Sequence, residues 1–149
     1  MASKPQFVTK RRFAAHPSTV FAAWTTPEHI ARWWGPNIGD TSRAEIDLRV
    51  GGRFTVLTDA ADGDQHQVSG VYREVVPDRK LVFTWAWRST PERESLVTID
   101  IEPDGDGTLL TLTHEQLFDG AARDRHETGW STALDKLERL VTPSPRSPS

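Results

Sequence analysis

The chain has 149 residues, a length typical of one domain, and 36% of them are hydrophobic, which is enough to form a core. Its 18 basic and 21 acidic residues leave a net charge of -3 without a dense Lys/Arg block, which disfavours nucleic-acid binding. The absence of cysteine excludes disulfides, thiolate catalysis and thiolate zinc sites. The longest apolar run, Val20 to Trp24, is too short to span a membrane, and residues 1–4 lack the apolar segment of a signal peptide, so we expect a cytoplasmic protein.

The N-terminal part of the chain predicts one strand followed by two short helices. Residues 7–14 have the composition of a strand, which we expect to end at His16-Pro17, because proline favours the first turn of a helix. Thr26-Pro27-Glu28 repeats this signal, with a cap residue, a proline and an acidic residue in the first turn. Gly35-Pro36 is expected to end the second helix.

From residue 42 to residue 114, apolar and polar residues alternate, which is typical of half-buried antiparallel strands. Ala44, Ile46, Leu48 and Val50 are expected to face inward before Gly51-Gly52, a hairpin signal. Further turns that contain glycine or proline separate the later runs. With the first strand, this pattern predicts seven strands, at residues 7–14, 42–50, 53–59, 66–76, 80–88, 94–102 and 108–114.

The last predicted element is the longest helix of the chain. It is expected to begin at Asp119 or just after it, and it has no breaker except Gly129 before Pro143. The final residues, 143–149, contain three prolines and three serines, a composition that cannot offset the entropy of ordering, so we predict a disordered tail. Residues 1–142 are expected to form a single domain.

These elements predict an α+β fold, in which a curved antiparallel sheet of about six to seven strands grips a long C-terminal helix. The two short helices follow the first strand. One helix cannot fill the concave face of such a sheet, so a cavity is expected between the helix and the sheet.

Four stretches of the sequence, in this order and at these spacings, resemble a known family. They are Trp33-Trp34-Gly35-Pro36, Asp47 to Gly52, Gly70 and Tyr72 with Pro77 and Leu81 to Trp85, and His126 with Gly129-Trp130. The chain resembles the SRPBCC (START-like, helix-grip) superfamily, and within it bacterial proteins similar to the C-terminal domain of the activator of heat-shock protein 90 ATPase. The resemblance covers residues 7–141 and implies a sheet that grips a C-terminal helix around a mostly apolar cavity. It implies no single reaction, because members bind lipids, hormones or polyketides and a minority are cyclases.

The residues expected to line the cavity are mostly aromatic. From the second helix and the sheet they are Trp33, Phe54, Val56, Tyr72, Phe83, Trp85, Trp87, Leu112 and His114. From the last helix they are His126 and Trp130. Aromatic residues dominate both cores and pockets, so the alternative for Phe83, Trp85 and Trp87 is plain core packing.

Two positions on the helices leave alternatives open. Trp33 and Trp34 project about 100° apart on a helix, which makes full burial of both in the same place difficult. Either one of them forms a lip of the pocket, or one is a core residue beside a partly exposed one. Gly129 costs roughly 1 kcal/mol in a helix interior relative to alanine. Either it allows the helix to approach the sheet closely, or it leaves space for a ligand beside Trp130.

A catalytic hypothesis rests on three polar residues of the strands. Glu74 or His114 could act as a general base, and Tyr72 could donate a hydrogen bond to a carbonyl. A histidine or tyrosine at the end of a strand more often has a structural role, and no motif of a known reaction class accompanies these residues. The five histidines show no metal-ligand spacing, so we expect neither a metal nor a cofactor.

The leading functional prediction is the binding of a small apolar or amphipathic molecule in the cavity. The first alternative is a cyclase-type or other small-molecule enzyme that uses the same cavity. The second is a protein-interaction module, which would need an exposed apolar patch around Trp33 or Trp34. A chaperone partner is not expected, because the eukaryotic activator uses an additional N-terminal domain that these residues do not encode. We expect no nucleic-acid or membrane partner, and a homodimer is compatible with the resemblance.

Overall fold

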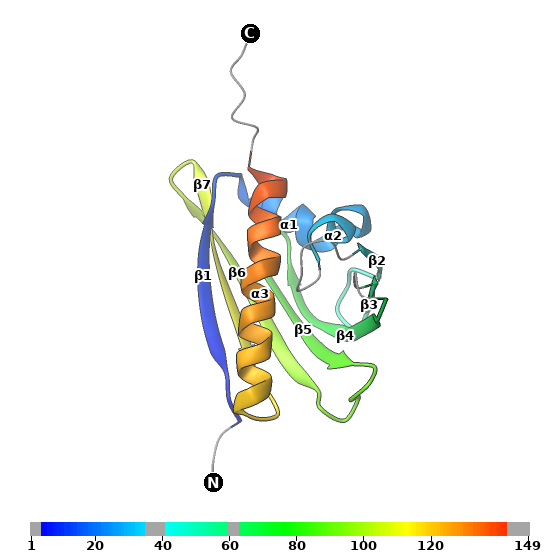
Figure 1. Cartoon of the computed structure of the whole chain (residues 1–149). Helices are drawn as coiled ribbons and strands as arrows, with labels where there is room; N and C mark the ends of the chain where they lie inside the picture. Colours follow the sequence, from blue (N-terminus) through cyan, green and yellow to red (C-terminus); the bar gives the residue numbers. More distant parts are fainter. Residues whose placement is uncertain (1–3, 35–40, 60–62, 143–149) are drawn as a thin grey trace.

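The computed structural model describes residues 4–34, 41–59 and 63–142, which form a curved sheet that wraps one long helix (Figure 1). The seven strands pair antiparallel in the order β1-β7-β6-β5-β4-β3-β2. They are β1 (Phe7–Phe13), β2 (Thr41–Ile46), β3 (Arg53–Asp59), β4 (Gln65–Val76), β5 (Lys80–Trp87), β6 (Ser95–Asp104) and β7 (Gly107–Glu115). The helices are α1 (Pro17–Thr25), α2 (Pro27–Trp33) and α3 (Gly120–Val141). The predicted α+β helix-grip fold is confirmed.

The first hairpin differs from its prediction, because β2 ends at Ile46 and not at residue 50. The chain instead forms a tight loop, in which the Arg49 amide donates to the Asp47 carbonyl (2.9 Å) and the Gly52 amide donates to the Arg49 carbonyl (2.8 Å). Leu48 and Val50 therefore lie in the loop and are exposed, and the alternation that predicted inward side chains for them is wrong.

A close approach of β4 to β5 depends on Gly70. A Cβ atom at this position would lie 1.8 Å from the Thr84 carbonyl oxygen and 2.7 Å from Cε1 of Phe54. The Val71 amide donates to the Thr84 hydroxyl (2.8 Å) here. Glycine inside a strand commonly marks such a close backbone approach.

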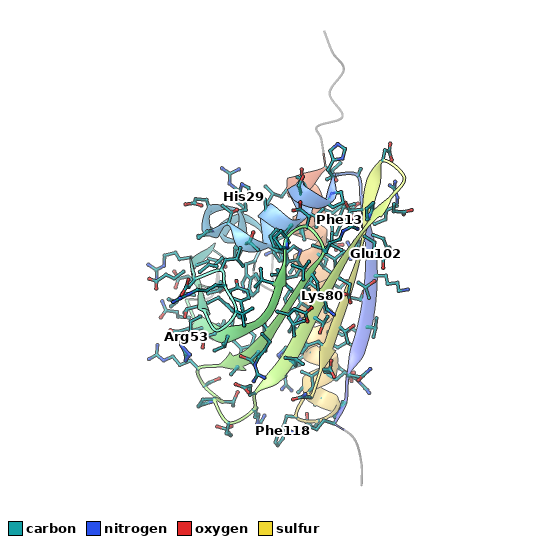
Figure 2. The ribbon with its side chains drawn as sticks, turned by 180° about the vertical axis from the view of Figure 1, so that it is seen from behind. Phe13, His29, Arg53, Lys80, Glu102 and Phe118 are labelled. Atoms are coloured by element: carbon teal, nitrogen blue, oxygen red, sulfur yellow. The ribbon has the colours of Figure 1, made fainter. Side chains whose placement is uncertain are left out.

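The long helix α3 crosses the concave face of the sheet (Figure 1). The helix begins where the Asp119 carboxylate accepts a hydrogen bond from the Ala122 amide (2.8 Å), as predicted for an N-cap. Its apolar face buries Ala133, Leu134 and Leu137, and Arg11 of β1 forms an ion pair with Asp135 (2.6 Å) at its edge. Figure 2 shows the opposite face of the sheet, where Lys80 and Glu102 lie on the strands.

The predicted disordered tail, residues 143–149, lies outside the described residues. Within the described part of the chain, no helix combines the length and the apolar character needed to cross a bilayer.

We predict that Gly70→Ala lowers the free energy of unfolding by about 2–3 kcal/mol, because the added methyl group meets backbone that cannot move without separating β4 from β5. Gly120→Ala is the matched control, since its added Cβ would lie 3.9 Å from the flexible end of Arg123, and it should change stability by no more than about 0.5 kcal/mol. Urea unfolding of both variants measures the difference. Equal free energies of unfolding for the two variants would contradict the close approach of β4 to β5 at Gly70.

Candidate functional site

A cavity of about 340 Å³ lies between α3 and the strands β3 to β5. The sheet side is lined by Thr58, His66, Trp85, Trp87 and Ser89. The helix side is lined by Trp34, Arg125, His126, Gly129, Trp130 and Ala133. This volume lies at the lower end of the roughly 300–1,000 Å³ of small-molecule pockets, so the space is sized for one small ligand.

Indole rings form most of the apolar wall. The ring centroid of Trp85 lies 5.1 Å from that of Trp130, 5.5 Å from that of Trp87 and 5.6 Å from that of Trp34. Trp85 and Trp87 meet edge to face, and such contacts contribute about 0.5–1.5 kcal/mol beyond the burial of area. The rings therefore support one another and form a preformed surface.

The expectation that Trp33 and Trp34 cannot both be buried is wrong. Trp33 is 0% exposed and Trp34 is 7% exposed. Trp34 caps the C-terminal end of α2, and other rings cover both side chains: the ring centroid of Trp33 lies 4.7 Å from that of Trp24, and the ring centroid of Trp34 lies 5.5 Å from that of Trp130. Trp33 lies in the core, where its Nε1 donates to the Ala23 carbonyl (2.9 Å), and Trp34 is the residue that lines the cavity.

His126 lines the cavity as a neutral imidazole. Trp87 Nε1 donates to His126 Nε2 (2.9 Å), which therefore carries no proton, and His126 Nδ1 donates to the Ala122 carbonyl (2.7 Å). Burial lowers the pKa of His126, the bond to Ala122 opposes this shift, and the nearby positive charge of Arg125 lowers the pKa further. Both ring nitrogens are thus already used for structure.

His114 is fully buried behind the cavity wall and connects α3 to the sheet. Trp130 Nε1 donates to His114 Nδ1 (3.1 Å), so the proton lies on Nε2, which donates to the Ser95 hydroxyl (2.8 Å). Ser95 in turn donates to the Trp85 carbonyl (3.3 Å). Burial, with a smaller contribution from His126, lowers the pKa of His114 to about 2, so this chain of hydrogen bonds holds a neutral ring.

The other residues expected in the cavity lie elsewhere in the core. Leu112 is completely buried and lines neither the 340 Å³ cavity nor the smaller space described next. Four of them surround a separate space of about 10 Å³, which is about the size of one water molecule: Phe54, Val56, Tyr72 and Phe83. Burial raises the pKa of Tyr72, so its hydroxyl stays protonated. The predicted set therefore divides between a ligand-sized cavity and a tightly packed region, with Trp34 in the wall of both.

Glu74 does not reach the cavity. The pairing register of β4 and β5 shifts between Tyr72 and Glu74, which turns the side chain of Glu74 outward. The Glu74 side chain is 49% exposed and lies 3.9 Å from Lys80. The three residues of the catalytic hypothesis thus occupy an outer surface, the small space and the buried region behind the wall, and the structure does not bring them together.

Several residues of the cavity were missed from the sequence. Thr58 shares the parity of Phe54 and Val56 on β3, so the strand pattern contained the signal for it. Arg125 precedes His126 on α3 and has no acidic residue three or four positions away, which was a second usable signal. No group of three His, Asp or Glu side chains that could hold a metal ion is found among the described residues.

The fold and the cavity define a helix-grip protein with space for a small ligand. The chain belongs to the family described as activator of Hsp90 ATPase homolog 1-like protein, whose family model matches residues 14–142. The resemblance to the SRPBCC superfamily is therefore confirmed. The comparison with curated proteins found no match.

Solved structures of bacterial proteins show the same fold. Protein CV1439 from Chromobacterium violaceum is 28% identical, with a TM-score of 0.85 over 93% of this chain and 98% of that chain. The AHSA1 protein from Silicibacter pomeroyi is 32% identical, with a TM-score of 0.79 over 91% and 96% of the two chains. CalU16 from Micromonospora echinospora is 30% identical, with a TM-score of 0.71 over 93% of this chain and 76% of that chain.

We predict that acid destabilises the protein through His114. The pKa of this group is 6.5 in an ordinary setting and about 2 in the folded protein, so below about pH 6.5 the unfolded chain binds a proton that the folded chain does not. Stability is therefore complete above pH 6.5 and falls as the pH drops below it, by on the order of 1 kcal/mol per pH unit. Urea unfolding between about pH 7 and pH 5 measures this slope.

His114→Gln should be less stable at neutral pH but should have a shallower pH dependence, because glutamine can occupy the same hydrogen bonds and does not titrate. His126→Gln is a second variant with the same expectation, and His29→Gln, at an exposed position, is the control that should keep the wild-type slope. A wild-type slope in both buried-site variants would contradict the prediction.

Proposed function

We propose that the protein binds a small, mostly apolar molecule in the cavity between α3 and the sheet. The observation that carries this proposal is a space of about 340 Å³ with four tryptophans in its wall. A ligand that filled it would remove both its own apolar surface and that of the indoles from water, which stabilises a complex by roughly 25 cal/mol per Å². The protein would act by burying and orienting the ligand.

The state of the polar groups supports binding more than catalysis. His126 is neutral, and both its nitrogens are hydrogen-bonded to the protein. The Thr58 hydroxyl lies 2.9 Å from that of Ser42 and is also partnered. A general base must be free to take a proton from its substrate, and neither of these two inner groups meets this condition. The other histidine of the wall, His66, is exposed and lies away from the buried floor.

The two tryptophans on which the protein-interaction alternative depends are not exposed in the described part of the chain. That alternative expected an exposed apolar patch around Trp33 or Trp34, and both side chains are buried. Small-molecule binding is therefore the function that the geometry supports best.

The test is a variant that fills the cavity. Gly129 lies in the cavity wall on α3, so the side chain of Gly129→Leu would project into the space that a ligand needs. The probe is 2-naphthamide, a flat, neutral aromatic molecule, and its binding can be followed by fluorescence because four of the six tryptophans line the cavity. We expect Gly129→Leu to bind the probe at least about tenfold more weakly than the wild type.

The matched control is Thr128→Leu, which places the same side chain on the exposed neighbouring position of the same helix. The control should bind like the wild type. Gly129→Leu should also unfold at the same or a higher temperature, because replacing a mid-helix glycine removes a penalty of about 1 kcal/mol. Equal affinities of the Gly129→Leu variant and the wild type, or no binding by the wild type, would overturn the proposal.

A further inference from the structure

We infer, building on the proposed function, that the ligand carries a negatively charged carboxylate or phosphate group, which Arg125 binds at the mouth of the cavity while a flat apolar body packs against the indoles. The inference names the chemical class of the ligand and one residue that selects it.

The first argument is the distribution of burial around the cavity. Its apolar floor is buried, with Trp34 at 7%, Trp85 at 4% and Trp130 at 5% exposure. The exposed residues of the wall, which lie at its mouth, are polar: Arg125, His66 and Ser89. A ligand that matches this gradient is amphipathic, with its polar end toward solvent.

The second argument is that the inner wall offers no cation and few free donors. His126 accepts from Trp87 and donates to Ala122, and Thr58 pairs with Ser42. The Nε1–H group of Trp85 has no partner, but it is a single neutral donor and is itself buried. A negatively charged group of the ligand placed deep in the cavity would therefore lose its hydration for at most one neutral hydrogen bond, which is costly. The exposed polar side chains lie at the mouth.

The third argument is that the cation at the mouth has no ion-pair partner among the described residues. Residues three and four positions away from Arg125 on α3 are alanine, threonine and glycine, so the helix offers it no ion pair. Across the part of the chain that the structure describes, the ion pairs involve other basic residues, such as Arg123 with Asp124 (3.2 Å) and Arg11 with Asp135 (2.6 Å). No Asp or Glu is among the described residues that line the cavity.

The chemistry of arginine then selects the kind of ligand. A guanidinium group presents a planar set of donors that matches two oxygens of a carboxylate or phosphate, and such charge-assisted pairs are stronger than neutral hydrogen bonds. The positive charge of Arg125 already acts inside the cavity, since it lowers the pKa of the adjacent His126. An anion at the mouth would be attracted by this charge, which no carboxylate among the described residues of the wall neutralises.

The test compares three probes of nearly the same shape: 2-naphthoate, neutral 2-naphthamide and 2-naphthyl phosphate. We expect the wild type to bind 2-naphthoate roughly tenfold more tightly than 2-naphthamide, and to lose this preference as the salt concentration rises from about 50 to 300 mM. Arg125→Gln should abolish the preference, so that this variant binds 2-naphthoate no more tightly than 2-naphthamide. Arg139→Gln removes the same charge from an exposed position of α3 outside the cavity and should keep the preference.

Each outcome decides a different question. Equal binding of the charged and neutral probes by the wild type would overturn the inference and leave the proposed function standing. A preference that persists in Arg125→Gln would overturn the role of Arg125. Failure of all three probes to bind the wild type would overturn the proposed function together with the inference. If the preference depends on Arg125, the tighter of the two charged probes identifies the charged group of the ligand. Tighter binding of 2-naphthyl phosphate indicates a phosphate ester, and tighter binding of 2-naphthoate indicates a carboxylate.

Discussion

The hydrogen bonds of the neutral His114 ring hold the two layers of this protein together. The ring accepts a hydrogen bond from Trp130 of α3 and donates one to Ser95 of β6. The Ser95 hydroxyl in turn donates a hydrogen bond to the Trp85 carbonyl of β5. Each of these groups is buried, so the loss of a hydrogen-bond partner from any of them would lower the stability of the folded protein. This series of hydrogen bonds forms only when the His114 ring is neutral, because a protonated Nδ1 could not accept a hydrogen bond from the Trp130 indole. These bonds between α3 and the sheet therefore require a neutral ring, which is consistent with the low pKa that burial gives to His114.

The cavity follows from where this connection lies along α3. After Trp130 the helix presents Leu134, Leu137 and Val141, which are buried in the core. Before Trp130 it presents Gly129, His126 and Arg125, and there the helix and the sheet enclose open space. The second indole-to-imidazole bond, from Trp87 to His126, joins the two sides of this space (2.9 Å). The wall is thus held in place from within the protein, which reduces the ordering cost that a ligand must overcome.

The architecture could be predicted from the sequence because it depends on repeated local signals. Alternation along the strands, the helix-start prolines and the Asp119 cap each indicate one element, and their order leaves few folds. The site was harder, because side-chain direction depends on single-residue irregularities. The register shift before Glu74 turned that residue outward, and Trp34 lies in the wall where Trp33 was expected. The register shift has no signature in the composition around it, and the helix pattern does not tell which of two adjacent tryptophans meets the cavity. Arg125 was missed although the sequence shows no acidic residue three or four positions away, because an unpaired arginine points to a ligand site only together with the apolar surface beside it.

The most direct test of a ligand cavity at this place is the proton–nitrogen correlation spectrum of the six indole N–H groups, recorded while 2-naphthoate is added. The account predicts that the signals of Trp34, Trp85, Trp87 and Trp130 shift together as the ligand binds, because these four rings form the wall. The signal of Trp33 should stay in place, because its N–H is bonded to Ala23 in the core. Saturable binding that leaves the four wall signals unchanged would contradict the account, since it would place the ligand at another surface of the molecule.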